Sequence, residues 1–87
     1  MVGLFSANCV GPGAATESDC EALGDKFVEL YMAEQTEDSL ALGPEVLAAA
    51  AATGRVEIID QCRTKATPKR TVARCREATS MAEFRDC

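Results

Sequence analysis

The chain lacks histidine and tryptophan, and it has one tyrosine and three phenylalanines among its 87 residues. Histidine is the commonest general base in enzymes. No G-x-S-x-G, Walker, dinucleotide-binding or H-E-x-x-H motif occurs either. The sequence therefore predicts a protein that is not an enzyme. It indicates no catalytic residue, no cofactor-binding residue and no small-molecule substrate.

Long apolar runs and an excess of basic residues are also missing. The longest apolar run, residues 46–52, has seven residues, whereas a membrane-spanning helix needs about 20. The net charge of −5 argues against a nucleic-acid partner. The start, MVGLFSANCV, is too short and too poor in basic residues for a complete signal peptide. We therefore expect no membrane span, and an exported chain would be a mature form without its leader.

Large hydrophobic side chains are sparse, because alanine makes up much of the 47% hydrophobic content. Alanine favours helix but buries little area. Residues 48–52 are an uninterrupted alanine run. A single small domain with so thin a core usually needs disulfides or a metal to be stable.

The first 15 residues, MVGLFSANCVGPGAA, contain three glycines and a proline and predict an extended N-terminal arm. Its apolar residues are expected to lie either on the chain's own domain or on a neighbouring subunit. The domain proper is then residues 16–87.

Helical signals follow one another through this domain, and no stretch alternates with the period of a strand. Thr16 and Asp19 predict a capping box that opens a helix ending near Thr36. Gly24 lies on the apolar face of that helix and would allow a partner helix to approach closely. The predicted fold is all-α, a bundle of three or four helices stapled by two disulfides.

Later helix starts are marked by proline and serine. Pro44 predicts the start of a second helix, with a break or kink at 53–54. Pro68 predicts a third helix. Ser80 and Glu83 form the S-x-x-E pattern of a capping box and predict a short last helix.

The five cysteines are spaced too widely for the common metal and redox motifs. No two are closer than 11 residues, whereas zinc and thioredoxin-type sites use close pairs. We therefore expect disulfides. The favoured pairing is Cys62–Cys75 with Cys20–Cys87, because the first pair flanks the turn at 67–68; the alternative is Cys75–Cys87 with Cys20–Cys62. Cys9 is left over, as a free thiol or an intermolecular bond.

Charge is distributed unevenly along the sequence. Residues 1–54 hold nine acidic residues and one basic one, whereas residues 55–87 hold five acidic and eight basic ones. The two parts carry about −8 and +3. Either the basic helices fold against the acidic helix, or separate molecules associate through complementary halves.

The segment from Ser18 to Cys87 resembles small exported helical domains of deltaproteobacteria, especially myxobacteria. The resemblance rests on Cys20 at the start of the first helix, on IIDQC ending the second, on PKRTVARC in the third and on ATSMAEFRDC at the end. It implies export to the cell envelope or the extracellular space, together with disulfides. It implies no activity.

A second resemblance is confined to Asp38-Ser39-Leu40, which is similar to the D-S-L of acyl carrier proteins. There the serine carries phosphopantetheine and opens a long helix, but here Gly43 and Pro44 follow almost at once. The expected function is therefore a non-catalytic structural or interaction protein of the cell surface or extracellular space. A self-assembling, filament-type subunit that uses the arm and the charged halves is favoured, so the expected partner is the chain itself. The alternatives are a binding module of the envelope for another molecule and an acyl-carrier-like protein that uses Ser39.

Overall fold

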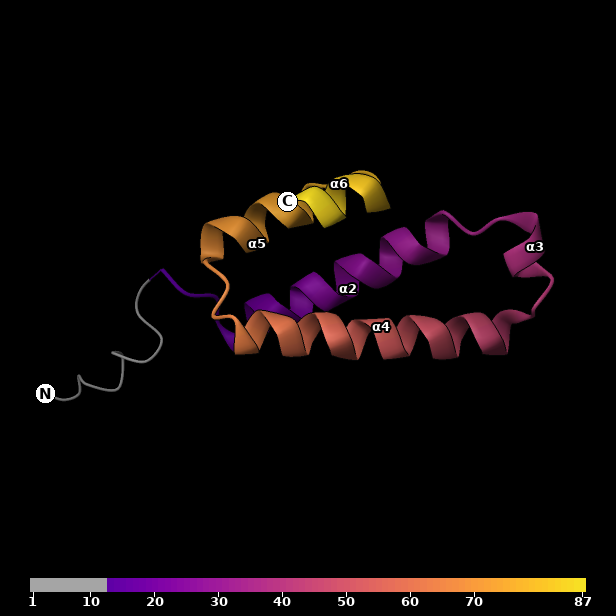
Figure 1. The fold of residues 1–87 in the computed structure, drawn as a ribbon, viewed down its shortest axis with the longest axis horizontal. Coiled ribbons are helices and arrows are strands. Elements are labelled where there is room, and N and C mark those ends of the chain that lie inside the picture. Colours follow the sequence, from indigo (N-terminus) through magenta and orange to yellow (C-terminus); the bar gives the residue numbers. More distant parts are fainter. Residues whose placement is uncertain (1–12) are drawn as a thin grey trace, which may run out of the picture.

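The computed structural model describes residues 13–87, and within them the chain is all-α, as predicted (Figure 1). Residues 1–12, and with them Cys9 and most of the predicted arm, lie outside the described part. The helices are α2 (Glu17–Ala33), α3 (Glu37–Leu40), α4 (Pro44–Thr64), α5 (Lys69–Arg76) and α6 (Met81–Asp86). None of these helices is long and apolar enough to cross a membrane.

The described end of the predicted arm lies on its own domain. The backbone N–H of Ala15 donates to the carbonyl of Thr67 at 2.8 Å, and that of Lys69 donates to the carbonyl of Gly13 at 2.7 Å. An isolated antiparallel bridge between Ala14 and Pro68 results. The entry to α2 is thereby fastened to the connection between α4 and α5.

The two long helices, α2 and α4, form an antiparallel hairpin whose bend contains α3 (Figure 1). Gly24 allows their close approach, as predicted: a Cβ atom there would lie 2.8 Å from Cγ1 of Ile59 and 2.9 Å from Cγ of Arg55. Such distances leave no room for a side chain. The hairpin therefore depends on glycine at this position.

The predicted break at residues 53–54 is wrong, since α4 runs through without interruption. Gly54 has a packing role instead. A Cβ atom there would overlap the ring of Phe27 on α2. Side chains of α4 thus pack against Gly24, and a side chain of α2 packs against Gly54.

Helices α5 and α6 pack on α2, so α2 is the central element of the fold. No Cα atom of α5 or α6 comes within 8 Å of one in α4. The principal core lies where α4, α5 and α6 meet α2. It contains Cys20, Leu23, Leu30, Ile59, Cys62, Val72, Cys75, Ala78 and Phe84.

Local capping chemistry starts three of the helices, and at α3 the hydroxyl of Thr36 accepts the N–H of Ser39. Thr16 and Asp19 form the predicted capping box at the start of α2. Ser80 accepts a bond from the N–H of Glu83 at 3.1 Å and caps α6. The predicted capping box is incomplete, because the Glu83 carboxylate does not accept the N–H of Ser80. It accepts hydrogen bonds from both the N–H and the hydroxyl of Thr79 instead.

Candidate interaction surface

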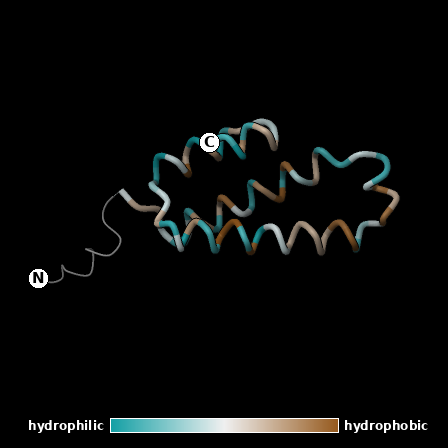
Figure 2. The backbone as a smooth tube through the Cα atoms, viewed as in Figure 1, coloured by the Kyte–Doolittle hydropathy of each residue, from teal (hydrophilic) through white to brown (hydrophobic). Residues whose placement is uncertain are grey.

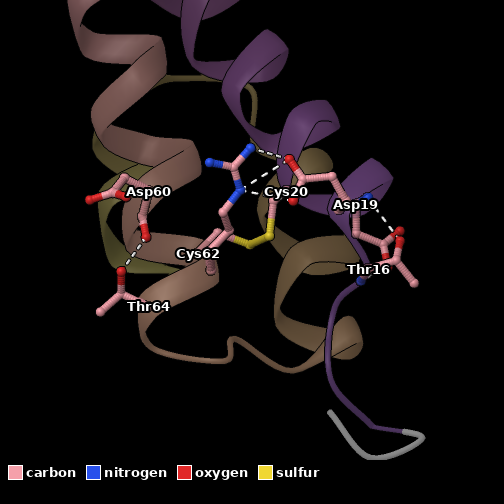
Figure 3. Close-up of polar contacts among 8 residues, drawn as sticks. Thr16, Asp19, Cys20, Asp60, Cys62 and Thr64 are labelled. Carbon is pink, nitrogen blue, oxygen red and sulfur yellow. Dashed lines mark hydrogen bonds and ion pairs between the residues drawn. A yellow bond between two sulfur atoms is a disulfide. The ribbon is translucent and has the colours of Figure 1, made fainter. Parts of the chain in front are cut away.

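The cysteine pairing differs from the favoured prediction. Cys20 on α2 is bonded to Cys62 on α4, with their Cα atoms 5.6 Å apart (Figure 3). Cys75 on α5 is bonded to Cys87 after α6, with a Cα separation of 5.2 Å. This is the alternative pairing. All four cysteines predicted to form disulfides do so, and Cys9 lies outside the described residues.

The position of α5 explains why the favoured disulfide pairing is wrong. The pairing of Cys62 with Cys75 requires α4 and α5 to lie side by side after the turn that joins them. Instead α5 crosses onto α2. Cys62 then faces Cys20 across the α2–α4 hairpin, while Cys75 faces the chain end that returns through α6.

The acidic and basic parts of the sequence meet within one chain at the disulfide-bonded end. Arg63 on α4 forms an ion pair with Glu17 on α2, and Nε of Arg55 lies 2.8 Å from Oδ1 of Asp25. The hydrogen bonds from Arg63 hold the pKa of Glu17 below its ordinary value. These contacts favour the intrachain interpretation of the charge asymmetry for this end of the hairpin.

The other half of the hairpin has a different charge. We define the distal half as residues 27–54, between the two residues Phe27 and Gly54 that meet across the helices. It contains five acidic residues and no basic one, whereas the rest of the chain contains nine of each. The entire net charge of −5 therefore lies in the distal half.

The exposed large hydrophobic side chains gather at the end of this same half. Four of them lie in residues 32–46, here called the distal tip: Met32 is 43% exposed, Leu40 56%, Leu42 62% and Val46 51%. Figure 2 shows apolar backbone positions along the bend and the adjoining end of α4. Figure 1 shows α3 and this end of α4 projecting past α6.

The acidic side chains of the distal tip are free of the ion pairs found elsewhere. Within residues 13–87, none of Glu37, Asp38 and Glu45 takes part in a salt bridge. Glu34, by contrast, accepts the backbone N–H of Met81 at 2.7 Å and so caps α6. The tip therefore combines apolar side chains with available negative charge.

Ser39, the serine of the D-S-L pattern, lies in the one-turn helix α3. Its hydroxyl is 3.0 Å from that of Thr36, which caps the same helix. Ser39 is half-buried. It does not open a long helix.

An apolar groove of about 420 Å³ lies at the opposite end of the molecule, between α4 on one side and α5 and α6 on the other. Its apolar lining includes Leu23 and Phe27 of α2, Ile58 of α4 and Phe84 of α6. Lys65 and Arg85 also line this groove, and no acidic side chain does. The groove exists because α5 and α6 rest on α2 without closing onto α4.

Neither the groove nor the distal tip was identified from the sequence. The sequence does contain a signal for the acidic tip, since no basic residue interrupts residues 27–54. The groove has none, because its lining comes from four separate segments. Comparison of the chain with known protein families, with curated proteins and with solved structures gives no match. Within residues 13–87, no three histidine, cysteine, aspartate or glutamate residues are grouped as metal ligands would be.

Proposed function

We propose that the protein is a non-catalytic, self-assembling subunit that works outside the cytoplasm. The observation that carries this proposal is the coincidence of exposed hydrophobic side chains and unbalanced charge in the distal half. Exposed apolar clusters on small proteins commonly mark interaction sites. The two disulfides support export, because such bonds persist in oxidising compartments.

The charge distribution favours head-to-tail association. Two distal tips placed against each other would bring like charges together, which opposes a symmetric tip-to-tip contact. All nine basic residues lie outside the distal half, and within residues 13–87 six of them form no salt bridge: Lys65, Lys69, Arg70, Arg74, Arg76 and Arg85. The other end of a second copy therefore supplies basic side chains that an acidic tip can meet. A contact between unlike surfaces repeats from copy to copy and extends into a filament unless rotation closes a ring.

The apolar surface of the tip suffices only for weak association. Complete burial of a leucine contributes about 1.5–3 kcal/mol, and Leu40 and Leu42 retain only 56% and 62% of their exposure. The four tip hydrophobics together therefore supply roughly 3–6 kcal/mol. Lost translational and rotational freedom costs about 4–15 kcal/mol. Charge complementarity must add to the contact, so assembly should weaken as salt screens it.

Sedimentation velocity over a wide concentration range, at low and high salt, tests the proposal. We expect larger species at high concentration that shrink when salt is added. Replacement of Leu40 and Leu42 by alanine should return the protein to monomers. Val56→Ala is the matched control, because Val56 is 64% exposed but lies outside the distal half.

A wild-type protein that stays monomeric at every concentration and salt level would refute self-assembly. That result would leave a binding module for another envelope component as the better explanation. The Cys9→Ala variant in the same experiment tests Cys9, because reductant would also break the two disulfides that stabilise the domain. If Cys9 links subunits, Cys9→Ala lowers the size of the assemblies.

A further inference from the structure

The groove between α4 and the α5–α6 pair has the properties that the distal tip requires of a receiving site. We infer that the groove binds the distal tip of a second copy of this chain, with Leu40 and Leu42 inserted and the acidic residues beside the basic rim. This inference rests on the proposed self-assembly and names the two surfaces that make its contact.

Charge complementarity selects the tip as the occupant. Lys65, at the C-terminal end of α4, and Arg85, on α6, are the charged residues that line the groove. The tip presents Glu37 and Asp38 in the same turn of helix as Leu40. An apolar insert with adjoining carboxylates therefore meets an apolar cleft with adjoining cations.

The shape of the two surfaces also agrees. The tip is convex, because the one-turn helix α3 lies in the bend that joins the diverging ends of α2 and α4 (Figure 1). The groove is a recess of about 420 Å³, within the range of volumes that protein pockets offer to their ligands. The groove and the tip lie at opposite ends of the α2–α4 hairpin, so a single contact can be repeated along a row of molecules.

A charge-reversal experiment tests the pairing of these surfaces. One variant carries Lys65→Glu and Arg85→Glu, and a second carries Glu37→Lys and Asp38→Lys. Each alone should fail to assemble, because its altered surface repels the wild-type partner surface. An equimolar mixture should assemble, since the reversed tip fits the reversed groove and the two unaltered surfaces fit each other. Sedimentation velocity should show recovery to within about tenfold of the wild-type association constant, a difference of about 1.4 kcal/mol.

The matched control is a variant with Arg70→Glu and Arg74→Glu. Both residues lie on the exposed side of α5, and neither lines the groove. This variant has the same charge change as the Lys65/Arg85 variant. It should assemble closer to the wild-type level, and the Glu37/Asp38 variant should not improve its assembly.

A photo-crosslinking amino acid in place of Leu42 gives an independent measurement. In a mixture of isotopically light and heavy chains, we expect mixed crosslinked peptides from residues 58–65 and 81–87. Assembly without these crosslinks and without charge-reversal rescue would overturn the inference and leave self-assembly standing. A monomeric wild type would overturn both. A monomeric wild type that binds dodecanoate, with loss of binding in the Lys65/Arg85 variant, would instead assign the groove to an anionic amphiphile.

Discussion

Removal of the disulfides one at a time should destabilise the domain unequally. The bond between Cys20 and Cys62 closes a separation of 42 residues, and that between Cys75 and Cys87 closes 12. Chain entropy alone then gives a contribution of about 4 kcal/mol for the first bond and about 3 kcal/mol for the second. Small domains have stabilities of about 5–15 kcal/mol, so either loss is a large fraction of the total.

The burial of the cysteines predicts the same order of stability loss. Cys20 and Cys62 are both almost completely buried, at 2% and 3% exposure, whereas Cys87 is only half-buried. The Cys20→Ala/Cys62→Ala variant should therefore melt below the Cys75→Ala/Cys87→Ala variant. A difference of 1 kcal/mol corresponds to about 4–8 °C for a domain of this size. Thermal and guanidinium unfolding, followed by circular dichroism, would measure it.

The control variant removes one cysteine from each bond. Cys20→Ala/Cys87→Ala leaves Cys62 and Cys75, which are not partners in the structure, so it should lose both bonds and fall below the other two variants. Cys9→Ala in every background prevents thiol exchange. If the control variant forms a Cys62–Cys75 bond and keeps near-native stability, the assigned pairing is refuted. If the variant lacking Cys75 and Cys87 proves the least stable of the three, the loop-entropy argument is refuted.

Two further predictions concern packing and pH. Gly54→Ala should destabilise the fold by roughly 1 kcal/mol in denaturant unfolding, because overlap with Phe27 outweighs the gain in helix propensity. Thr53→Ala, at the exposed neighbouring position, is the control. Stabilisation by Gly54→Ala would contradict the packing role. The pKa of Glu17 is lowered in the folded state by its hydrogen bonds from Arg63, so its contribution to stability is present above about pH 4.3 and is lost as the pH falls further. Glu17→Gln should therefore flatten the acid limb of the stability profile, and an unchanged limb would show that the ion pair contributes nothing.

The features that the sequence predicted correctly are local ones. The capping box of Thr16 and Asp19 depends on residues three apart, and the start of α4 depends on Pro44. The all-α class follows from such signals because each helix carries its own. Gly24 was also interpreted correctly, since a glycine on an apolar helical face has few other uses.

The features that the sequence did not predict depend on where separate helices dock. Gly54 has the same local signature whether it ends a helix or admits an aromatic ring, and only the position of Phe27 decides between them. The disulfide pairing likewise required knowledge that α5 packs on α2 and not on α4. The groove has the same origin, so it could not be foreseen either.

The fold brings together charges that are separated along the sequence. Divided at Gly54 along the chain, the protein has one strongly acidic part and one basic part. The antiparallel hairpin places residues 17–25 beside residues 55–63, and Glu17–Arg63 and Asp25–Arg55 join them. Outside the distal half acidic and basic residues balance, so the net negative charge of the chain lies beyond Phe27, while Lys65 and Arg85 remain outside these ion pairs.

The stabilising elements and the exposed apolar side chains lie in different parts of the hairpin. Both disulfides and all of the principal core except Leu30 lie outside the distal half, and within that half α4 contributes only Leu47 and Ala51 as buried residues. The distal half is thus held by few buried contacts and carries the exposed hydrophobic side chains. The four hydrophobic residues of the distal tip each leave 43–62% of their surface exposed in the described fold. A second molecule that buries this surface would supply the contacts that the small core leaves unmade, and the cross-linked end would present the groove that receives it.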